Sequence, residues 1–378
     1  MKYNLIVIGG GPAGMMAAGH AAEKGAFVLL LEKNDRLGRK LLITGKGRCN
    51  ITHHEFNNRD LISVFGKNSD FLFSSFSKFS VPETLFFFNN RGLETKVERG
   101  NRIFPESDNS EDVLDVLIDY MREGNVKIQT KAEVTEIIYK KNKIEKVIVN
   151  NYEELIADNY LITTGGLSYP ETGSTGDGYV WAEEMGHKII DPMPALVGII
   201  TSEKWIKELQ GLSLKNVEIS IWQNDKKIDS RFGEALFTHE GLSGPIILDM
   251  SKEIGKSLKK GLLKLKIDFK PVLNYSILDK RLIKDFKKNN NKEFKNSLGE
   301  LLPQKLIPII ISMSNIDPYK KVNGVTKEER KILLHLLKEF TLNIERIDSF
   351  NRAVITCGGV DLHNIDPQTL KSKLVDNL

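Results

Sequence analysis

The sequence predicts an α/β protein that begins with an open parallel sheet and carries a β-rich segment inserted later in the chain. Three observations predict this class. A short apolar strand at residues 4–8, a helical pattern ending at Gly25 and a second apolar strand at residues 27–31 form a βαβ unit. Short β-like runs separated by turns begin at residue 192. Helical periodicity then returns at residues 275–285, 298–314 and 326–340.

The turn of the βαβ unit has glycines at the G-x-G-x-x-G positions, namely Gly9, Gly11 and Gly14. The first permits the tight turn, the second lets the backbone approach a diphosphate, and the third allows the helix to pack closely on the strand. Glu32 ends the second strand, where a carboxylate can accept hydrogen bonds from both ribose hydroxyls. Because these signals agree, the sequence predicts a Rossmann-type dinucleotide site rather than a structural glycine turn. The motif alone does not choose between NAD and FAD.

Residues 36–50 form a basic, glycine-containing loop that closely follows Glu32. Three glycines and five cations in this segment are typical of a loop wrapped round a phosphate-bearing ligand. Arg39, Lys40 and Arg48 are the charged candidates. A solvated surface loop is the alternative interpretation.

The rest of the chain is expected to complete the parallel sheet and to form the inserted segment. A helix is expected at residues 110–123, with Ser110 as its N-cap, and strands are expected at residues 126–129, 145–149 and 160–164. Strands at residues 196–200, 217–222, 235–237 and 263–269 suggest a small barrel or sandwich. We therefore expect an FAD- or NAD-binding domain at residues 1–191 plus 361–378, an inserted β domain at 192–271 plus 341–360, and a helical subdomain at 272–340.

Two side chains are candidates for catalysis. His239 follows a predicted strand in Phe-Thr-His-Glu-Gly and could serve as a proton donor beside a redox cofactor. A structural, hydrogen-bonded histidine is the alternative. Arg48 from the basic loop is the second candidate. Cys49 is either a redox partner of the cofactor or an ordinary buried thiol. The buried thiol is favoured, because no second cysteine is near in sequence.

Composition limits the partners. The 54 basic and 50 acidic residues give a net charge of only +4, so no global basic field favours nucleic acid or a membrane surface. The run at residues 287–292, Lys-Lys-Asn-Asn-Asn-Lys, is expected to be a solvated loop rather than an RNA contact. Gly9 to Gly11 interrupt the N-terminal apolar run too early for an export signal, and two cysteines fit a reducing compartment, which predicts a cytoplasmic protein. No metal site is expected, and the oligomeric state stays open.

Several segments together resemble a known family. Residues 5–14, 32–50, 161–179, 233–245 and 356–360 are similar to the bacterial NAD(P)/FAD-dependent oxidoreductases described as aminoacetone oxidase-like or dehydro-bile-acid reductase-like flavoproteins. The most distinctive motifs are Gly-Arg-Cys-Asn, Gly-Gly-Leu-Ser-Tyr-Pro-Glu-Thr-Gly and Thr-His-Glu-Gly. The resemblance implies FAD rather than NAD in the N-terminal site. The residues that it implies around FAD are Gly9, Gly10, Gly11, Pro12, Ala13, Gly14, Glu32, Lys33, Arg39, Lys40, Gly45, Arg48, Asn50, Val134 through its backbone, Thr164, Gly165 and Gly166.

The resemblance implies a flavin-dependent oxidoreductase that acts on a small organic substrate. Since only one G-x-G-x-x-G is present, NAD(P)H would dock transiently as the reductant. Two alternatives stay open: an RNA-acting flavoprotein, and a catalytically silent dinucleotide-binding or regulatory protein. In the family, Ser-Lys-Leu-Val leads to a last strand and a glycine turn that close the FAD site, whereas this sequence ends at Asp376-Asn377-Leu378. We therefore expect weak retention of FAD.

Overall fold

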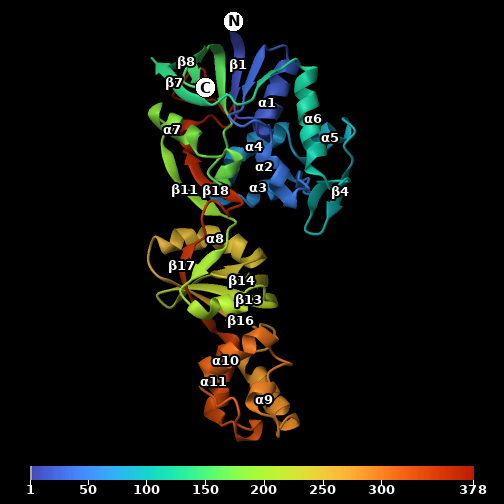
Figure 1. The fold of residues 1–378 in the computed structure, drawn as a ribbon, viewed down its shortest axis with the longest axis vertical. Helices are drawn as coiled ribbons and strands as arrows, with labels where there is room; N and C mark the ends of the chain where they lie inside the picture. The colour runs from blue at the N-terminus through green and yellow to red at the C-terminus, as the bar shows by residue number, and fades with distance from the viewer. Residues whose placement is uncertain (1) are drawn as a thin grey trace. The chain divides into compact units, whose positions relative to one another are not determined.

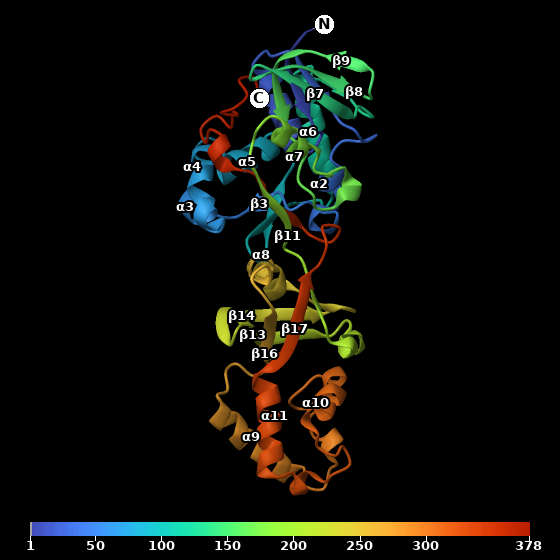
Figure 2. The same ribbon diagram turned by 90° about the vertical axis from the view of Figure 1, so that its left-hand side faces the viewer.

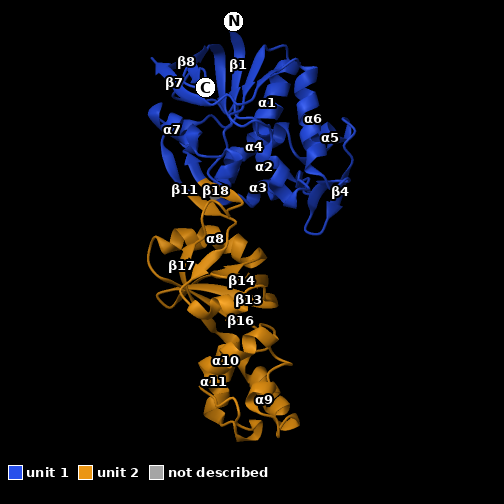
Figure 3. Cartoon of the chain, viewed as in Figure 1, with its two compact units in different colours: residues 1–192, 358–378 blue, residues 193–357 orange. Residues whose placement is uncertain are grey.

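The computed structural model describes residues 2–378, with the backbone alone for Lys67. The chain forms two compact units (Figure 3). Unit 1 comprises residues 1–192 and 358–378, and unit 2 comprises residues 193–357. The chain leaves unit 1 along β11 (Ile189–Ala195) and returns along β18 (Ile355–Val360), and these two strands pair in a small sheet.

Unit 1 is built on a four-stranded parallel sheet (Figure 1). The strand order is β10-β1-β2-β6, with bounds β1 (Tyr3–Ile8), β2 (Val28–Leu31), β6 (Lys127–Gln129) and β10 (Ala157–Ile162). Leu5 pairs with both Val28 and Asn159. The chain therefore moves outward from β1 to β2 and β6 and places β10 on the other side of β1. This change of direction is a topological switch point, where open α/β sheets bind ligands.

Each face of this sheet buries a different set of side chains. Helices α1 (Pro12–Glu23) and α6 (Ser110–Glu123) cover one face, where Val7 and Leu30 pack with Met15 and Leu117. The other face packs on an antiparallel sheet of β7 (Val134–Lys140), β8 (Lys143–Val149) and β9 (Glu153–Leu155), and on α7 (Asp177–Glu184). Figure 2 shows β7, β8 and β9 side by side. Burial on both faces explains why the parallel strands are continuous apolar runs.

The remainder of unit 1 lies between β2 and α6 in sequence. Strands β3 (Thr52–His53), β4 (Thr95–Glu98) and β5 (Arg102–Pro105) form a sheet of order β3-β5-β4. The helices of this segment are α2 (Arg39–Ile43), α3 (Asn58–Ser63), α4 (Ser69–Lys78) and α5 (Val81–Asn89). A capping box between Ser80 and Glu83 starts α5.

Unit 2 contains a closed barrel of order β12-β15-β14-β13-β16-β17. The bounds are β12 (Ile199–Thr201), β13 (Ser213–Gln223), β14 (Lys226–Phe237), β15 (Gly241–Ser243), β16 (Leu263–Asp268) and β17 (Phe340–Ile347). Helix α8 (Pro245–Leu258) buries Ile247, Met250 and Ile254 against the barrel core. Between β16 and β17 the chain forms α9 (Tyr275–Lys288), α10 (Ile307–Ser314) and α11 (Lys327–Lys338). Figure 1 shows these three helices grouped at one end of the barrel.

The predicted fold class is confirmed: a Rossmann-type domain carries an inserted barrel, which itself carries helices. Local details differ. The N-cap of α6 is Asn109, whose side chain accepts from the Glu111 amide, and Ser110 is the first helical residue. The helix expected at residues 298–314 begins only at Ile307, after a 3-10 turn at Gln304–Leu306, because Pro303 lacks the amide hydrogen that a continuous helix would need there. Across residues 2–378, no helix combines the length and apolar character needed to cross a bilayer.

Candidate dinucleotide-binding site

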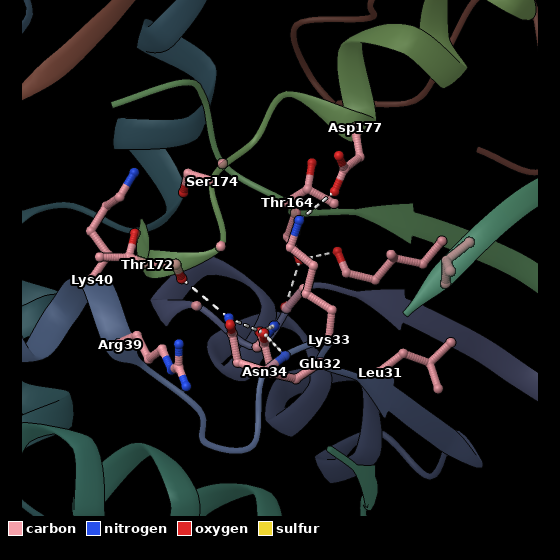
Figure 4. Close-up of a pocket in the computed structure, with 18 of the residues that line it drawn as sticks. Leu31, Glu32, Lys33, Asn34, Arg39, Lys40, Thr164, Thr172, Ser174 and Asp177 are labelled. Atoms are coloured by element: carbon pink, nitrogen blue, oxygen red, sulfur yellow. Dashed lines mark hydrogen bonds and ion pairs between the residues drawn. The ribbon is translucent and has the colours of Figure 1, made fainter. Parts of the chain in front are cut away.

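A cavity of about 250 Å³ opens at the carboxyl edge of the parallel sheet (Figure 4). Its lining comes from the residues that follow β1, β2 and β10, and from the loop that precedes α7. The cavity therefore lies at the switch point between β1 and β10. Residues 9–13, Glu32, Lys33, Arg39, Lys40, Val134, Thr164 and Gly165, all implied by the family resemblance, line this cavity.

The N-terminus of α1 faces the cavity without a protein cap. Gly11 is its N-cap residue, and within the described chain no side chain accepts a hydrogen bond there and no acidic residue stands in the first turn. A Cβ on Gly11 would meet no atom of the described residues within 4 Å, whereas a Cβ on Gly14 would lie 2.0 Å from the Gly9 carbonyl oxygen. Gly14 is thus required by packing, and Gly11 leaves open space beside unsatisfied amides at the positive end of the helix dipole. That combination fits a diphosphate.

Glu32 is buried, with 8% of its surface exposed, and its carboxylate ties two segments together. Its Oε2 accepts from the Gly10 amide at 2.7 Å, and its Oε1 accepts from the backbone and side-chain nitrogens of Asn34 at 2.8 and 2.7 Å. Figure 4 shows the Glu32 and Asn34 side chains turned toward each other. A carboxylate has about four lone-pair sites, so capacity for a ribose hydroxyl remains on Oε2.

The cationic side chains around the cavity differ in whether a carboxylate pairs with them. Lys33 Nζ donates to Thr175 Oγ1 at 2.5 Å and pairs with Asp177 Oδ2 at 2.7 Å, and Arg39 pairs with Asp35 at 2.6 Å. Burial lowers the pKa of the Lys40 ammonium, and the negative charge of Glu171 partly opposes this. A partly desolvated cation beside an anion-binding helix terminus gains most from a phosphate group.

Other residues implied by the resemblance lie outside the cavity lining, namely Gly14, Gly45, Arg48, Asn50 and Gly166. The Arg48 guanidinium stacks on the Phe104 ring, 4.0 Å from its centroid, and pairs with Glu98 at 2.7 Å and Asp108 at 3.2 Å. These contacts hold the basic loop against the β4–β5 sheet. Arg48 stays a predicted catalytic and FAD-binding residue.

Cys49 is buried, and its burial raises the pKa of the thiol while a hydrogen bond with Thr44 opposes this. A thiol in this environment has little thiolate character at neutral pH.

His239 belongs to unit 2, in the turn between β14 and β15, where its Nε2 lies 3.1 Å from Glu240 Oε2. Sequence reasoning did not anticipate the roles of Asn34, Asp177 and Trp181, which line the unit 1 cavity. The run Thr172-Gly173-Ser174 also lines it, and Gly173 was the one signal for this segment. Among residues 2–378, no group of three or more acidic, histidine or cysteine side chains could hold a metal ion.

The donors at the cavity fit FAD. The uncapped α1 terminus and the nearby cations suit the diphosphate, and Glu32 suits a ribose. When bound, FAD supplies two-electron redox chemistry.

Known proteins are similar in sequence to nearly the whole of this chain. The chain is 30% identical over 375 residues to the 3-dehydro-bile acid delta(4,6)-reductase of Clostridium scindens, covering 98% of this chain and 90% of that protein. It is 27% identical over 380 residues to the ribosomal RNA dihydrouridine synthase of Escherichia coli, covering 100% of this chain and 90% of that protein. The open conformation of a flavocytochrome c3 fumarate reductase aligns with a TM-score of 0.47 and 12% identity, over 100% of this chain and 72% of that one.

The family model described as HI0933-like protein Rossmann domain matches residues 3–378. This match spans nearly the whole sequence and confirms the resemblance to FAD-dependent oxidoreductases. The chain therefore belongs to the HI0933-like Rossmann-domain family.

Proposed function

We propose that this flavin-dependent oxidoreductase reduces a carbon–carbon double bond conjugated to a carbonyl group in a small organic substrate, and that NAD(P)H reduces its FAD. The observation that carries the proposal is the chemistry shared by its relatives' names. One relative is named a delta(4,6)-reductase of a 3-dehydro bile acid, and another is named for making dihydrouridine. A 3-oxo-4,6-diene and the uracil ring each present a double bond conjugated to a carbonyl, so one type of reaction accounts for both names.

The residues of unit 1 support the cofactor half of this proposal. The α1 amides and Lys40 would hold the diphosphate, and Glu32 would hold a ribose while it also fixes the Gly10 turn. A single glycine motif serves FAD, so NAD(P)H would bind only for the time of reduction.

The test follows the visible absorbance of the FAD-loaded chain without oxygen. NADH or NADPH should bleach the flavin, and cyclohex-2-en-1-one should restore its colour, whereas cyclohexanone and a primary amine should not. The proposal would be overturned if no conjugated enone reoxidised the flavin, whether NADH, NADPH or dithionite had reduced it.

A second candidate function, reduction of uridine in RNA, is favoured by the distribution of charge. Unit 2 has 29 Lys and Arg against 20 Asp and Glu, whereas unit 1 has 25 against 30. On α9, Lys280, Lys284 and Lys287 recur at helical spacing and are exposed, opposite the buried Leu282. Such a basic stripe could contact phosphates without reading sequence.

Salt dependence separates this candidate from the first. A fluorescein-labelled uridine-containing RNA hairpin should bind the full chain with an affinity that falls steeply between 50 and 200 mM salt, by roughly the counterion-release relation. Replacing Lys280, Lys284 and Lys287 by glutamate should weaken binding at least about ten-fold. The matched control replaces the exposed Lys140, Lys141 and Lys143 of unit 1 and should have a smaller effect. Equal losses in both variants would count against the α9 stripe.

A further inference from the structure

A groove of about 600 Å³ lies beside α10 in the helical part of unit 2. This volume falls within the range of roughly 300–1,000 Å³ that small-molecule sites occupy. Its lining residues all come from the segment between Lys295 and Pro318, so the groove is complete within unit 2. Figure 2 shows α10 next to α11.

One face of α10 forms the apolar floor of the groove. Ile307 and Ile311 are one helical turn apart, and Ile316 follows the end of the helix. Ile307 and Ile316 are buried, whereas Ile311 is partly exposed. A planar ring that rests on this floor would remove apolar surface from water.

The other side of the groove is held in place by its backbone. The Phe294 amide donates to the Lys320 carbonyl at 2.8 Å, and the Lys295 amide donates to the Pro318 carbonyl at 3.1 Å. These bonds join the segment before α10 to the segment after it. Asn315, which ends α10, has a φ of +53°, in the left-handed region that asparagine adopts more readily than most residues. The groove is therefore a defined part of the fold.

Four side chains at the groove carry hydrogen-bonding groups that the protein leaves unused. They are Asn296, Gln304, Ser312 and Asn315, and all four are exposed. No hydrogen bond within residues 2–378 occupies their amide or hydroxyl groups. Each carboxamide presents an acceptor oxygen next to a donor nitrogen, which is the pattern that pairs with the edge of a nucleobase. We refer to the amides of Asn296, Gln304 and Asn315 as the free carboxamides.

An exposed aromatic ring adjoins the groove. Tyr319 follows the lining residue Pro318 and is 64% exposed. The ammonium of Lys295, another lining residue, lies 4.0 Å from the centroid of the Tyr319 ring. Proteins that bind single-stranded RNA stack unpaired bases on such rings and hydrogen-bond the base edges.

The helical part of unit 2 also carries an excess of positive charge. Residues 272–340 contain 14 Lys and Arg against 8 Asp and Glu, a net charge of +6, whereas the whole chain has +4. Lys292 and Lys321 are exposed, and no carboxylate of residues 2–378 pairs with them. The Val322 amide donates to the Lys292 carbonyl at 3.0 Å, which places both lysines on neighbouring segments. This charge complements the phosphates of a nucleic acid.

We infer that this groove binds an unpaired nucleobase of single-stranded RNA. The free carboxamides hydrogen-bond the edge of the base, its face rests on Ile307 and Ile311, and Tyr319 stacks on the neighbouring base. Lys292 and Lys321 contact the phosphates. The inference rests on the second candidate function, an RNA partner, and adds the place where a base is held. Binding at the groove needs neither FAD nor turnover, since every group involved belongs to unit 2.

The first test measures RNA binding by the full chain without FAD. By fluorescence anisotropy, a fluorescein-labelled ten-nucleotide oligouridylate or oligoadenylate should bind, and Asn296→Ala, Gln304→Ala and Tyr319→Ala should each weaken binding at least about five-fold. Tyr319→Phe should bind like the wild type, because stacking needs the ring and not the hydroxyl. Asn90→Ala and Tyr152→Ala, at exposed positions of unit 1, are the matched controls. Melting temperatures should stay at the wild-type value in all of these variants.

Salt dependence separates base contacts from phosphate contacts. Gln304→Ala should lower the affinity by the same factor at 50 and 200 mM salt, because a neutral amide displaces no counterion. A double variant, Lys292→Gln with Lys321→Gln, should instead reduce the slope of log K against log salt by about 1.4, since each phosphate contact of a single strand contributes about 0.7. A slope that Gln304→Ala changed as much as the double variant does would overturn the base contact.

A second test separates the base from the rest of a nucleotide. The ¹⁹F signal of Tyr319 in 3-fluorotyrosine-labelled chain, assigned from Tyr319→Phe, should shift on addition of uridine 5′-monophosphate or adenosine 5′-monophosphate. Ribose 5-phosphate should not shift it, and Gln304→Ala should reduce the shift that the nucleotides cause.

The outcomes distinguish the inference from the second candidate function. If RNA binds the wild-type chain and the groove variants equally well, the inference fails while the second candidate function stands. If RNA does not bind but the nucleotides shift the Tyr319 signal, the second candidate function fails and the groove is a site for the base of a free nucleotide. If neither RNA nor a nucleotide has an effect, both fail.

Discussion

The Glu32 carboxylate accepts a hydrogen bond from the Gly10 amide, with 2.7 Å between Oε2 and the nitrogen. The same side chain that ends β2 therefore holds the glycine turn that follows β1. Because the Oε1 atom is held by Asn34, Glu32 is fixed before any ligand arrives. The acidic residue of the motif thus has a structural role in addition to its predicted role as a ribose acceptor.

Replacing Glu32 by alanine should weaken FAD binding by about 1.5–3 kcal/mol, or roughly 10- to 150-fold, through loss of charge-assisted bonds and of the fixed turn. It should also lower the melting temperature of the flavin-free chain, because the buried Gly10 amide loses its acceptor. Fluorescence titration with FAD and thermal unfolding measure the two effects. Glu136→Ala, at an exposed position on β7, is the control. Unchanged FAD affinity in Glu32→Ala would remove Glu32 from the site.

The contact of α1 with α6 should make stability depend on pH in the alkaline range. Burial, and then the hydrogen bond to Glu23, raises the pKa of Tyr120 from 10.0 to about 12. The unfolded chain therefore loses this proton first, so the free energy of unfolding falls as the pH rises from about 10 to about 12. Below pH 10 this contribution is fully present.

Urea unfolding at pH 9 and pH 11.5 tests this dependence against a Tyr120→Phe variant. The stability advantage of the wild-type chain should shrink between the two values, because phenylalanine has no proton to lose. An advantage that stays constant across this range would show that the Tyr120 proton is not linked to folding.

The two cysteines should differ in reactivity. Cys49 is buried with a raised pKa, whereas Cys357 is partly exposed. Iodoacetamide at pH 7.5 should modify Cys357 at least about ten times faster than Cys49, because the thiolate is the reacting form. Peptide mass spectrometry gives both rates. Equal rates of modification would indicate that the basic loop opens readily. Because we expect Cys49 to be an ordinary buried thiol, Cys49→Ser should leave the reduction of FAD by NAD(P)H unchanged.

The parallel sheet, its first helix and the glycine turn could be predicted from the sequence because each depends on local signals. The run at residues 4–8, the turn at 9–14 and the periodicity of residues 110–123 need no distant contact to be recognised. By contrast, α8 was not anticipated, although Ile247, Met250 and Ile254 recur at helical spacing within residues 245–258. Strand β17 is defined by pairing with β12 and β16, which precede it by many residues.

In the candidate site, too, the contacts that depend on residues distant in sequence could not be predicted. The cations of residues 36–50 are evident in the sequence, yet Arg48 pairs with Glu98 and Asp108, acids that local composition could not connect to it. Likewise, the approach of Asp177 to Lys33 arises only when the segment after β2 and the start of α7 meet in space. Sequence pattern identifies the donors, and tertiary contacts decide which of them remain free for a ligand.

Gly11→Ala tests whether the cavity at the α1 terminus holds the diphosphate of FAD. The new Cβ would meet no described protein atom within 4 Å, and Gly11 has a φ of −79°, which alanine adopts freely. Isothermal titration of the flavin-free chain should give one FAD per chain for the wild type and at least about ten-fold weaker binding for Gly11→Ala, with an unchanged melting temperature. Gly14→Ala, whose Cβ would collide with the Gly9 carbonyl, should instead lower the melting temperature. Equal FAD affinity in the wild type and Gly11→Ala would contradict this placement of the cofactor.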